Sequence, residues 1–389
     1  MKKAICLILC ICLLCIPVSA AGSTKTAENK GNTVVGAPEV KAKSCILMEA
    51  ETGQILFENN ADERLAPASI TKVMSLLLVM EALERGDIKL DTIITASEHA
   101  CSMGGSQIWL EPGEQMSVDE LLKATVIASA NDATVALGEQ LAGSEEGFVA
   151  LMNKRAKELG MNNTNFINCT GLDAEGHLTT AHDVAVMSAA LIKHELIKKY
   201  STVWMDSLRN GESELTNTNK LVRFYEGCTG LKTGTTSTAG YCLSATAKRD
   251  GMELVAVVMD GQTSNDRFEG AKKLLNFGFA NFGFSKVKAD LGERTHINVD
   301  KGVVSKIPIS AEGSFNILLP KTAKGEIKQQ ISLPDSITAP IKKGDTVGKV
   351  TLSVDGEQIG VINIKADEGS DRLNITRTFV WLLKALFYL

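Results

Sequence analysis

Residues 65–72, Leu-Ala-Pro-Ala-Ser-Ile-Thr-Lys, open a strongly periodic apolar stretch. Apolar residues recur after it at the spacing of a helix, at Val73, Leu76, Leu77, Met80 and Leu83. A buried helix is therefore predicted to begin here and to end near residues 85–86, where a glycine follows an arginine. Ser69 and Lys72 stand three residues apart, so both side chains lie on one face of the first turn. A serine beside an amine at the positive end of a helix is a candidate activated nucleophile.

This S-x-x-K pattern is weak evidence by itself, because ordinary composition produces such pairs by chance. The chain holds a second copy, at Ser285 and Lys288. An exposed serine and a solvated lysine at the start of a helix is the alternative interpretation of the first copy. Two further motifs downstream favour the catalytic interpretation instead.

The second motif is Ser129-Ala130-Asn131, which interrupts two helices predicted between residues 117 and 141. Small and polar residues at such a break lie on the connecting turn, and their side chains point into the space between the helices. Taken alone, a plain capping turn is the favoured alternative. The motif gains weight from its position between the other two.

The third motif is Lys232-Thr233-Gly234. Two strand-like runs follow it, at residues 241–247 and 252–259, and Arg249-Asp250-Gly251 between them is a strong hairpin signal. The motif is therefore predicted to lie on, or at the end of, an antiparallel strand. It is not a phosphate-binding loop, because the Walker spacing is absent and the context is strand to strand.

Both ends of the 389-residue chain are predicted to lie outside the folded core. Residues 1–20 carry two lysines, a short apolar run and a small-residue cleavage pattern, which together predict a secretory signal peptide. Residues 21–43 are polar and predict a flexible tether. Residues 369–389 mix large apolar with basic side chains, which favours an amphipathic helix in a membrane interface over one packed on the protein's own core.

Between these ends the sequence pattern changes once. Residues 44–284 combine a predicted hairpin at residues 44–57 with the helices and strands described above, and so predict an α/β (α+β) domain. Residues 285–368 hold short alternating runs separated by turns, which predict a small all-β domain. The second S-x-x-K copy falls at this boundary.

Composition argues against several other classes of protein. A formal net charge of −5 argues against general nucleic-acid binding. Four of the nine cysteines lie in the predicted signal peptide, and the rest form no C-x-x-C pair, so neither a zinc site nor a full disulfide framework is indicated. His177 and His182 have the wrong spacing for a two-histidine helical zinc site and are interpreted as structural.

The order S-x-x-K, S-x-N and K-T-G matches the signature of penicillin-binding proteins and class A β-lactamases. Within that superfamily the chain resembles the low-molecular-mass penicillin-binding proteins, the serine-type D-alanyl-D-alanine carboxypeptidases. Three features carry the narrower resemblance: Pro67-Ala68, Ala130, and Gly-His-Leu-Thr-Thr-Ala at residues 176–181. The resemblance implies a β-lactamase/transpeptidase-like catalytic domain with an antiparallel sheet and a helical cluster, followed by the small all-β domain and the amphipathic helix.

The resemblance also implies roles in acyl transfer. Ser69 would be acylated. Lys72 would act as the base, with a pKa lowered by desolvation and by a nearby positive charge such as that of Lys232. Ser129 would relay a proton to the departing D-alanine, and Asn131 would hold Lys72 and the substrate amide.

Substrate binding would fall mainly to the third motif. Lys232 and Thr233 would receive the terminal carboxylate, with Arg267 as a further candidate. Gly234 would let the substrate backbone lie close to the strand. The backbone N–H groups of Ser69 and Thr235 would form the oxyanion hole. No metal or cofactor is implied.

The implied reaction removes the terminal D-alanine from peptidoglycan stem pentapeptides, with β-lactam antibiotics as covalent inhibitors. The implied location is the outer face of the cytoplasmic membrane, after export, with attachment through the C-terminal helix. A class A-like β-lactamase and a non-enzymatic cell-wall-binding protein are the alternatives. Between Asn131 and Lys232 no convincing deacylating glutamate occurs, since Glu175 sits in Ala-Glu-Gly-His, and the complete catalytic set speaks against the second alternative.

Overall fold

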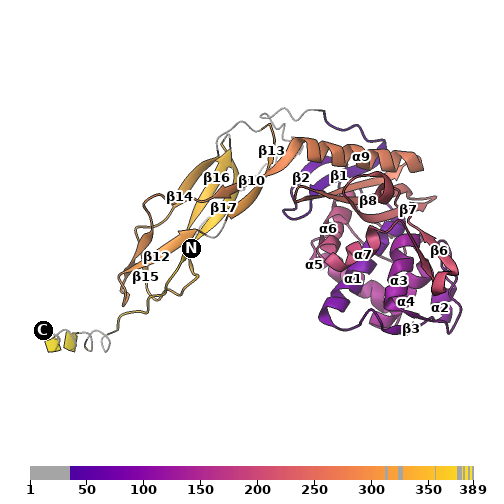
Figure 1. Cartoon of the computed structure of the whole chain (residues 1–389), viewed down its shortest axis with the longest axis horizontal. Helices are drawn as coiled ribbons and strands as arrows, with labels where there is room; N and C mark the ends of the chain where they lie inside the picture. Colours follow the sequence, from indigo (N-terminus) through magenta and orange to yellow (C-terminus); the bar gives the residue numbers. More distant parts are fainter. Residues whose placement is uncertain are drawn as a thin grey trace, which may run out of the picture.

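The computed structural model describes residues 36–311, 314–322, 327–354 and 356–374, together with residues 379, 382–383 and 386–387. The predicted signal peptide and the predicted tether up to residue 35 lie outside the described residues, as do residues 375–378, 380–381, 384–385 and 388–389 of the predicted C-terminal helix. Figure 1 shows a larger part built from helices and strands and a smaller part built from strands. The α/β domain and the all-β domain expected from the sequence are both present.

The larger part is organised around a five-stranded antiparallel sheet with the order β2-β1-β9-β8-β7. Its strands are β1 (Ala42–Glu49), β2 (Ile55–Asn59), β7 (Cys228–Thr236), β8 (Gly240–Arg249) and β9 (Met252–Gly261). The two hairpins predicted from apolar runs are β1–β2 and β8–β9, and both predictions are confirmed. β7, which carries the third motif, lies at one edge of this sheet next to β8.

Helices cover both faces of the sheet. α9 (Ser264–Asn281) packs on one face through a core that includes Leu254 and Leu275. The other face packs on a cluster of helices through a second core, to which α1 (Lys72–Arg85) and α6 (Ala181–Ile192) contribute. Figure 1 shows the sheet between α9 and this cluster.

Shorter elements complete the larger part. The remaining helices are α2 (Glu98–Cys101), α3 (Val118–Lys123), α4 (Asn131–Ala142), α5 (Glu145–Glu158), α7 (Lys198–Ser201) and α8 (Leu221–Phe224), with the 3₁₀ turns η3 (Glu195–Ile197) and η4 (Arg209–Gly211). Two small hairpins pair β3 (Ile93–Thr95) with β4 (Gln115–Ser117) and β5 (Met205–Leu208) with β6 (Ser213–Thr216). In the part of the chain that the structure describes, no helix has the length and apolar content that crossing a membrane requires.

The helix predicted to start within residues 65–72 is confirmed, but its first turn is tighter than expected. Ser69 lies in a 3₁₀ turn, η1 (Ala68–Thr71), which leads directly into α1. α1 is buried along most of its length and contacts α4, α5 and α6. Ser69 is therefore attached to a helix that its neighbours hold on several sides.

The two helices predicted between residues 117 and 141 are confirmed as α3 and α4. A π-helical turn, η2 (Ala124–Ala128), extends α3 up to Ser129. Ser129 itself has a φ of 64°, in the left-handed region that most side chains avoid. The second motif thus stands at a break in helical geometry, as the small and polar residues there indicate.

The smaller part is the all-β domain. Its main sheet has the order β14-β16-β17-β12-β11-β15, and β10 pairs with β13 in a separate ribbon. Its strands are β10 (Phe282–Lys288), β11 (His296–Asp300), β12 (Lys306–Ala311), β13 (Ser314–Pro320), β14 (Lys328–Ser332), β15 (Ser336–Thr338), β16 (Thr346–Val354) and β17 (Glu357–Ala366). Ile307, Val350 and Ile362 belong to its core.

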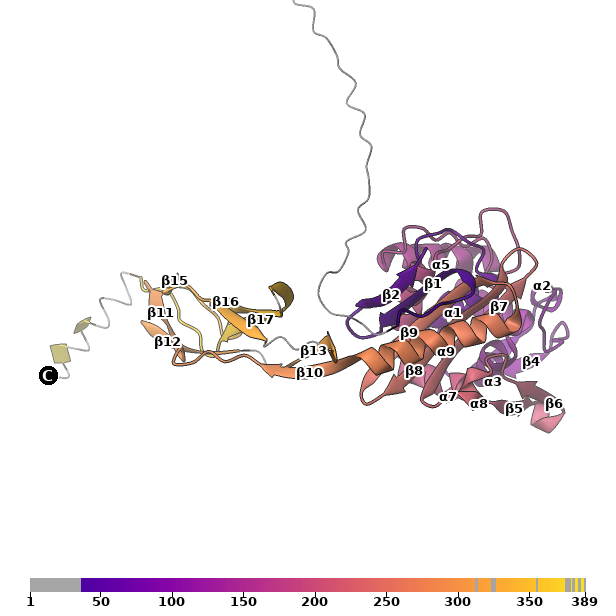
Figure 2. The same cartoon turned by 90° about the horizontal axis from the view of Figure 1, so that it is seen from above.

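The ribbon of β10 and β13 connects the two parts of the molecule. β10 leaves the end of α9, as Figure 2 shows, and its first residue Phe282 packs with Leu318 of β13 into the core beneath α9. Farther along the ribbon, Val287 and Ile317 belong to the core of the all-β domain. The domain boundary expected between residues 284 and 285 therefore falls inside β10.

The second S-x-x-K copy also lies on β10. Residues three apart in a strand point to opposite faces, so the side chains of Ser285 and Lys288 diverge. In the 3₁₀ turn before α1 the same spacing has the opposite effect and brings Ser69 and Lys72 together. The local backbone conformation therefore allows the serine and lysine to meet in the first copy of the motif but not in the second.

Candidate active site

Ser69 and Lys72 meet at the start of α1. Lys72 is fully buried, and its Nζ lies 3.1 Å from Ser69 Oγ. The same nitrogen donates to Asn131 Oδ1 at 2.5 Å and to the backbone carbonyl of Thr170 at 2.7 Å. A neutral amine has two N–H donors and one lone pair, and these two acceptors engage the donors. The lone pair is then left facing the Ser69 hydroxyl, as proton abstraction requires.

Burial supplies the neutral amine. Desolvation lowers the pKa of Lys72 to about 7, and the negative charge of Asp132 offsets only part of that effect. The pKa of Lys232 is lowered well below its usual value, first by burial and then by the positive charges of Lys72 and Arg267. The family resemblance implies that the charge of Lys232 helps to lower the pKa of Lys72. Desolvation lowers the pKa of Lys72 instead, and it is the pKa of Lys232 that is lowered by the neighbouring positive charge.

The second motif forms another wall of the site. Asn131 is the first residue of α4, and its Nδ2 donates to the Gly104 carbonyl at 2.6 Å while its Oδ1 receives Lys72. This pairing of both ends of the amide fixes the side chain and leaves the Lys72 amine with a defined partner. Ser129 is buried on the turn before α4, at the C-terminal end of η2.

The third motif lies on β7 as predicted. Lys232 is buried, with its Nζ 3.0 Å from the Thr233 carbonyl, and Thr233 Oγ1 donates to Thr218 Oγ1 at 2.7 Å. Gly234 follows at the point where β7 passes the nucleophile turn. A Cβ atom there would stand 2.9 Å from the backbone nitrogen of Ser69, so only glycine allows this approach.

Arg267 reaches the same strand from the first turn of α9. Its Nη1 donates to the Gly234 carbonyl at 3.0 Å and to Thr235 Oγ1 at 2.8 Å. Its guanidinium also lies 5.4 Å from the ring centre of Tyr241. The structure thus brings Arg267 and Ser69 to the K-T-G strand, and Lys72 connects Ser69 with Asn131.

Thr170 is a contributor for which the sequence gives no signal. Its contribution is a backbone carbonyl, which any residue could supply. Gly171 after it has a φ of 89°, and a Cβ there would stand 1.8 Å from the carbonyl oxygen of Ala68. The loop at residues 169–173 is therefore packed directly against the nucleophile turn.

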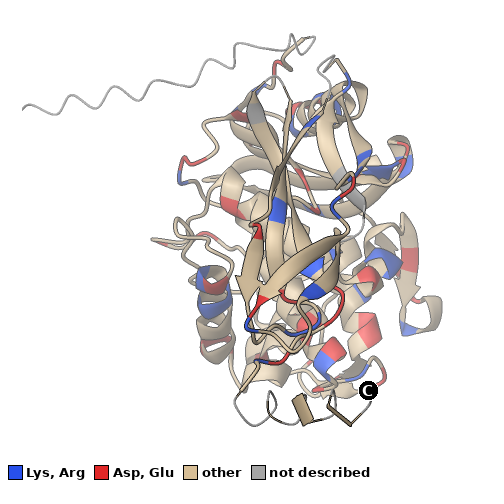
Figure 3. Ribbon diagram, turned by 90° about the vertical axis from the view of Figure 1, so that its left-hand side faces the viewer, with Lys and Arg blue, Asp and Glu red and all other residues tan. Residues whose placement is uncertain are grey.

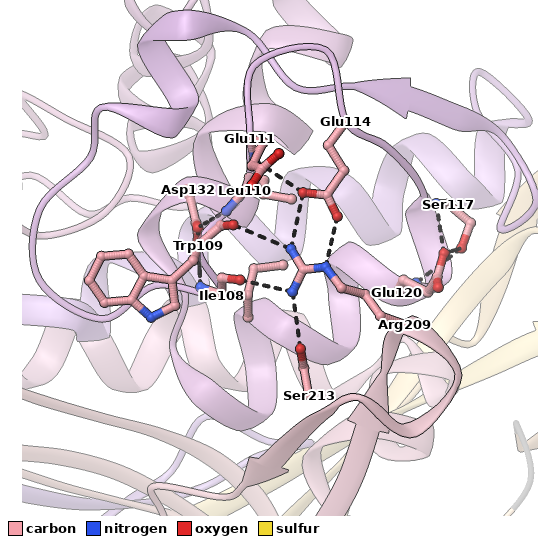
Figure 4. A network of polar contacts seen from close by, with 10 residues as sticks. All are labelled: Ile108, Trp109, Leu110, Glu111, Glu114, Ser117, Glu120, Asp132, Arg209 and Ser213. Atoms are coloured by element: carbon pink, nitrogen blue, oxygen red, sulfur yellow. Dashed lines mark hydrogen bonds and ion pairs between the residues drawn. The ribbon is translucent and has the colours of Figure 1, made fainter.

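Asp132 and Arg209, which were not singled out from the sequence, hold the loop at residues 108–110 (Figure 4). Asp132 is buried and accepts hydrogen bonds from the backbone nitrogens of Ile108 and Leu110, both at 3.1 Å. Arg209 pairs with Glu114 at 2.8 Å and also donates to the Ile108 carbonyl at 3.0 Å. An aspartate directly after S-x-N is visible in the sequence, whereas the distant Arg209 has no local signal.

A cavity of about 410 Å³ opens beside the nucleophile turn. Pro67 and Ala68 form one side, and the loop at residues 171–178 forms the other. Glu175, the residue considered for a deacylating role, is an exposed member of this loop.

The described residues hold no group of three His, Cys, Asp or Glu side chains that could bind a metal ion. The cysteines beyond residue 36 are free thiols, at Cys45, Cys101, Cys169, Cys228 and Cys242. Acyl transfer needs a nucleophile, a base, a proton relay and cations for an anionic substrate. The groups gathered around Ser69 can supply all of these.

Comparisons with known proteins agree with this chemistry. A family profile described as D-alanyl-D-alanine carboxypeptidase matches residues 31–263, and one described as penicillin-binding protein 5, C-terminal domain, matches residues 288–372. The chain is 45% identical over 335 residues to D-alanyl-D-alanine carboxypeptidase DacF of Bacillus subtilis (strain 168). This match covers 84% of this chain and 85% of that protein.

Solved structures resemble the chain as well. Penicillin binding protein 5 from Haemophilus influenzae has 33% identity and a TM-score of 0.79, and the match covers 87% of this chain and 100% of that one. Penicillin-binding protein D2 from Listeria monocytogenes, in its ampicillin-bound form, has 32% identity and a TM-score of 0.57, over 63% of this chain and 100% of that one. On these matches, the chain belongs to the D-alanyl-D-alanine carboxypeptidase family of penicillin-binding enzymes.

Proposed function

We propose that this protein removes the terminal D-alanine from peptidoglycan stem pentapeptides through an acyl-enzyme on Ser69. The geometry of Lys72 carries the proposal. Asn131 and Thr170 accept its N–H groups, and its third position faces Ser69 Oγ at 3.1 Å. A base oriented by two fixed acceptors toward a serine hydroxyl is what nucleophilic catalysis by that serine needs.

In acylation, neutral Lys72 takes the proton of Ser69 while Ser69 Oγ bonds to the carbonyl carbon of the penultimate D-alanine. Negative charge gathers on the carbonyl oxygen, where the backbone N–H groups of Ser69 and Thr235 stabilise it. The peptide bond then breaks, and Ser129 relays the proton from Lys72 to the departing amine. Free D-alanine leaves, and the shortened peptide stays on Ser69 as an ester.

In deacylation, water replaces the departed D-alanine, and Lys72 acts as the base a second time. A β-lactam follows the same first step, because its ring amide is opened by the same serine. Its leaving nitrogen stays tethered to the acyl group, so the ester persists. The likeness to a relative solved in an ampicillin-bound form supports this part of the proposal.

The substrate peptide would lie along β7 as an added strand, since β7 is at the edge of its sheet. Its terminal carboxylate would meet Lys232, Thr233 and Arg267. Lys232 and Arg267 are buried cations without a carboxylate among their hydrogen-bond acceptors in the described part of the chain. An anionic substrate would therefore supply the charge that these groups lack.

Intact-mass measurement tests the proposal. After incubation with benzylpenicillin the protein should gain one penicilloyl group, and with a pentapeptide ending in D-Ala-D-Ala it should release D-alanine. Ser69→Ala should abolish both, while Ser285→Ala, in the second S-x-x-K copy, should leave both unchanged. Rapid β-lactam hydrolysis without an adduct would favour a β-lactamase, and no reaction with either compound would favour a non-enzymatic wall-binding protein.

We also infer that the mature enzyme is exported and held at the outer face of the cytoplasmic membrane by a helix within residues 369–389. The described end of the all-β domain supports this. The backbone of Val303 donates to Asp371 and that of Leu373 donates to Lys301, both at 2.8 Å. Val303, Val304 and Leu373 are exposed where the chain leads into this segment. Figure 3 views the molecule from this end, with the C-terminus marked.

A further inference from the structure

His177 has no assigned role in the reaction, yet both of its ring nitrogens are engaged. The side chain is buried in the loop after Thr170. Its Nδ1 lies 3.0 Å from the backbone nitrogen of Ile167, and its Nε2 lies 2.8 Å from Thr71 Oγ1. Thr71 is the third residue of the S-x-x-K motif, so the contact links this loop to the nucleophile turn.

The partners fix the direction of each hydrogen bond. Because the backbone N–H of Ile167 can only donate, Nδ1 must accept and carries no proton. The proton of the neutral ring is therefore on Nε2, which donates to Thr71 Oγ1. Burial lowers the pKa of His177 to about 4, which keeps the ring neutral. Thr71 Oγ1 is then free to give its own proton to the Ala68 carbonyl, which lies at 2.9 Å.

The last acceptor in this series of hydrogen bonds, the Ala68 carbonyl, belongs to a strained part of the backbone. Ala68 has a φ of 48°, a left-handed conformation that a residue with a Cβ rarely adopts. Its carbonyl is also confined by Gly171, where a Cβ would stand 1.8 Å from the oxygen. Such a conformation persists only when surrounding contacts hold it. The Thr71 hydroxyl is one of those contacts.

The Ala68 carbonyl and the Ser69 N–H are opposite ends of one planar peptide unit. A hydrogen bond that fixes the carbonyl therefore fixes the direction of the N–H as well. The Ser69 nitrogen faces β7, since a Cβ at Gly234 would stand 2.9 Å from it. This is the N–H group that acyl transfer needs as an oxyanion donor.

We propose that His177 is a positioning residue for the oxyanion hole, acting through Thr71 on the Ala68–Ser69 peptide. The proposal rests on the proposed acyl transfer at Ser69. His177 does not contact the reacting atoms in this account. It keeps the Thr71 hydroxyl turned toward Ala68 by occupying its acceptor side. Removing the ring lets that hydroxyl rotate, and the Ser69 N–H loses its fixed direction.

A purely structural role for His177 is the competing interpretation. The ring packs edge-on to Phe166, at 5.9 Å between ring centres, and anchors the loop through Ile167. A structural role predicts a lower melting temperature but ordinary catalysis by the molecules that fold. A positioning role predicts a loss of transition-state stabilisation with little change in substrate binding.

The experiment compares full-length variants at both ends of the contact. Thr71→Val removes the hydroxyl at nearly constant volume, and Thr71→Ser keeps it. His177→Ala removes the ring, and His182→Ala is the matched control at a half-exposed histidine paired with Asp183. For each, kcat and KM are measured on a D-Ala-D-Ala peptide, and the inhibition constant is measured for a peptidyl boronic acid, which forms a tetrahedral adduct with the serine.

Thr71→Val and His177→Ala should lower kcat and weaken boronate inhibition by about tenfold to a hundredfold, with KM nearly constant. Thr71→Ser and His182→Ala should remain close to the wild type. Equal activity of Thr71→Val and Thr71→Ser would overturn the proposal, even if His177→Ala fails to fold. Wild-type kcat in folded His177→Ala would overturn it as well. Neither result would affect the acyl-enzyme itself, whose own test is Ser69→Ala.

Discussion

Gly234 lies so close to Ser69 that a Cβ atom at position 234 would stand 2.9 Å from the Ser69 backbone nitrogen. The K-T-G strand and the nucleophile turn therefore touch through their backbones. This contact places the backbone of β7 beside the Ser69 nitrogen, where the proposed oxyanion hole would form. It also explains why the third motif ends in glycine.

Gly234→Ala is predicted to damage catalysis more than folding. The added methyl group would meet Ala68 Cβ and Ser69 N, both at 2.9 Å, so β7 and the nucleophile turn must separate. A misplacement of reacting groups by about 1 Å lowers rates by about a hundredfold. The second-order rate constant for acylation by benzylpenicillin measures the loss.

Gly283→Ala is the matched control for this substitution. Gly283 also lies in a strand, but a Cβ there would meet only the flexible Lys321 side chain, at 3.4 Å. This variant should acylate like the wild type. Normal acylation by Gly234→Ala would mean that the two backbones do not need to be this close.

The pH dependence of acylation is predicted to follow Lys72. Its pKa is lowered to about 7 by burial, and only the neutral amine can take the Ser69 proton. As the pH falls below that value the amine becomes protonated, so the acylation rate should fall about tenfold per pH unit. Stopped-flow measurements on either side of neutral pH would show this acid limb.

Asn131→Asp should move the acid limb to higher pH. It places a carboxylate where an amide oxygen now lies 2.5 Å from Lys72 Nζ. An opposite charge at that distance favours the protonated amine and raises its pKa by about 1–3 units. An acid limb that stays in place would show that another group controls it.

The candidate catalytic groups can be found in the sequence because each belongs to a short local pattern. Ser69 and Lys72 share one turn, Ser129 and Asn131 share one break between helices, and the K-T-G residues share one strand. Periodicity identifies the element that carries each pattern. The expectation that these three motifs meet in space comes from the family resemblance, because their spacing along the chain does not determine it.

Other contributions leave no comparable trace in the sequence. The Thr170 carbonyl is a backbone atom 98 residues from Lys72, and backbone acceptors have no residue signature. Arg209 and Glu114 pair across 95 residues and resemble any surface ion pair until the fold is known. β3 and β5 are too short for alternation to be visible. The start of β10 cannot be recognised in the sequence, because its aromatic residues continue the apolar pattern at the end of α9.

Lys232→Ala is predicted to discriminate between substrates that differ only at the C-terminus. If Lys232 receives the free carboxylate, its removal should lower kcat/KM on a D-Ala-D-Ala peptide by about a hundredfold. The same peptide with an amidated C-terminus lacks that charge and should lose far less. Equal losses on the two peptides would assign Lys232 to another role, such as its electrostatic coupling to Lys72.

Removing the segment after the all-β domain is predicted to abolish membrane binding without affecting catalysis. A protein truncated after Asn374 keeps the pairing of Val303 with Asp371 and of Leu373 with Lys301. It loses the apolar and basic residues that would lie in a lipid interface. Binding to vesicles that contain anionic phospholipid should therefore be lost, while acylation by benzylpenicillin should be unchanged.

Sedimentation with anionic and with neutral vesicles separates the two contributions to membrane binding. The full mature chain should bind anionic vesicles more tightly, because basic side chains add to the burial of apolar ones. Vesicle binding by the truncated protein would transfer the attachment to Val303, Val304 and Leu373, which remain exposed at the end of the domain. Loss of folding on truncation would instead make the segment part of the core. Either outcome would contradict an anchor formed by the residues after Asn374.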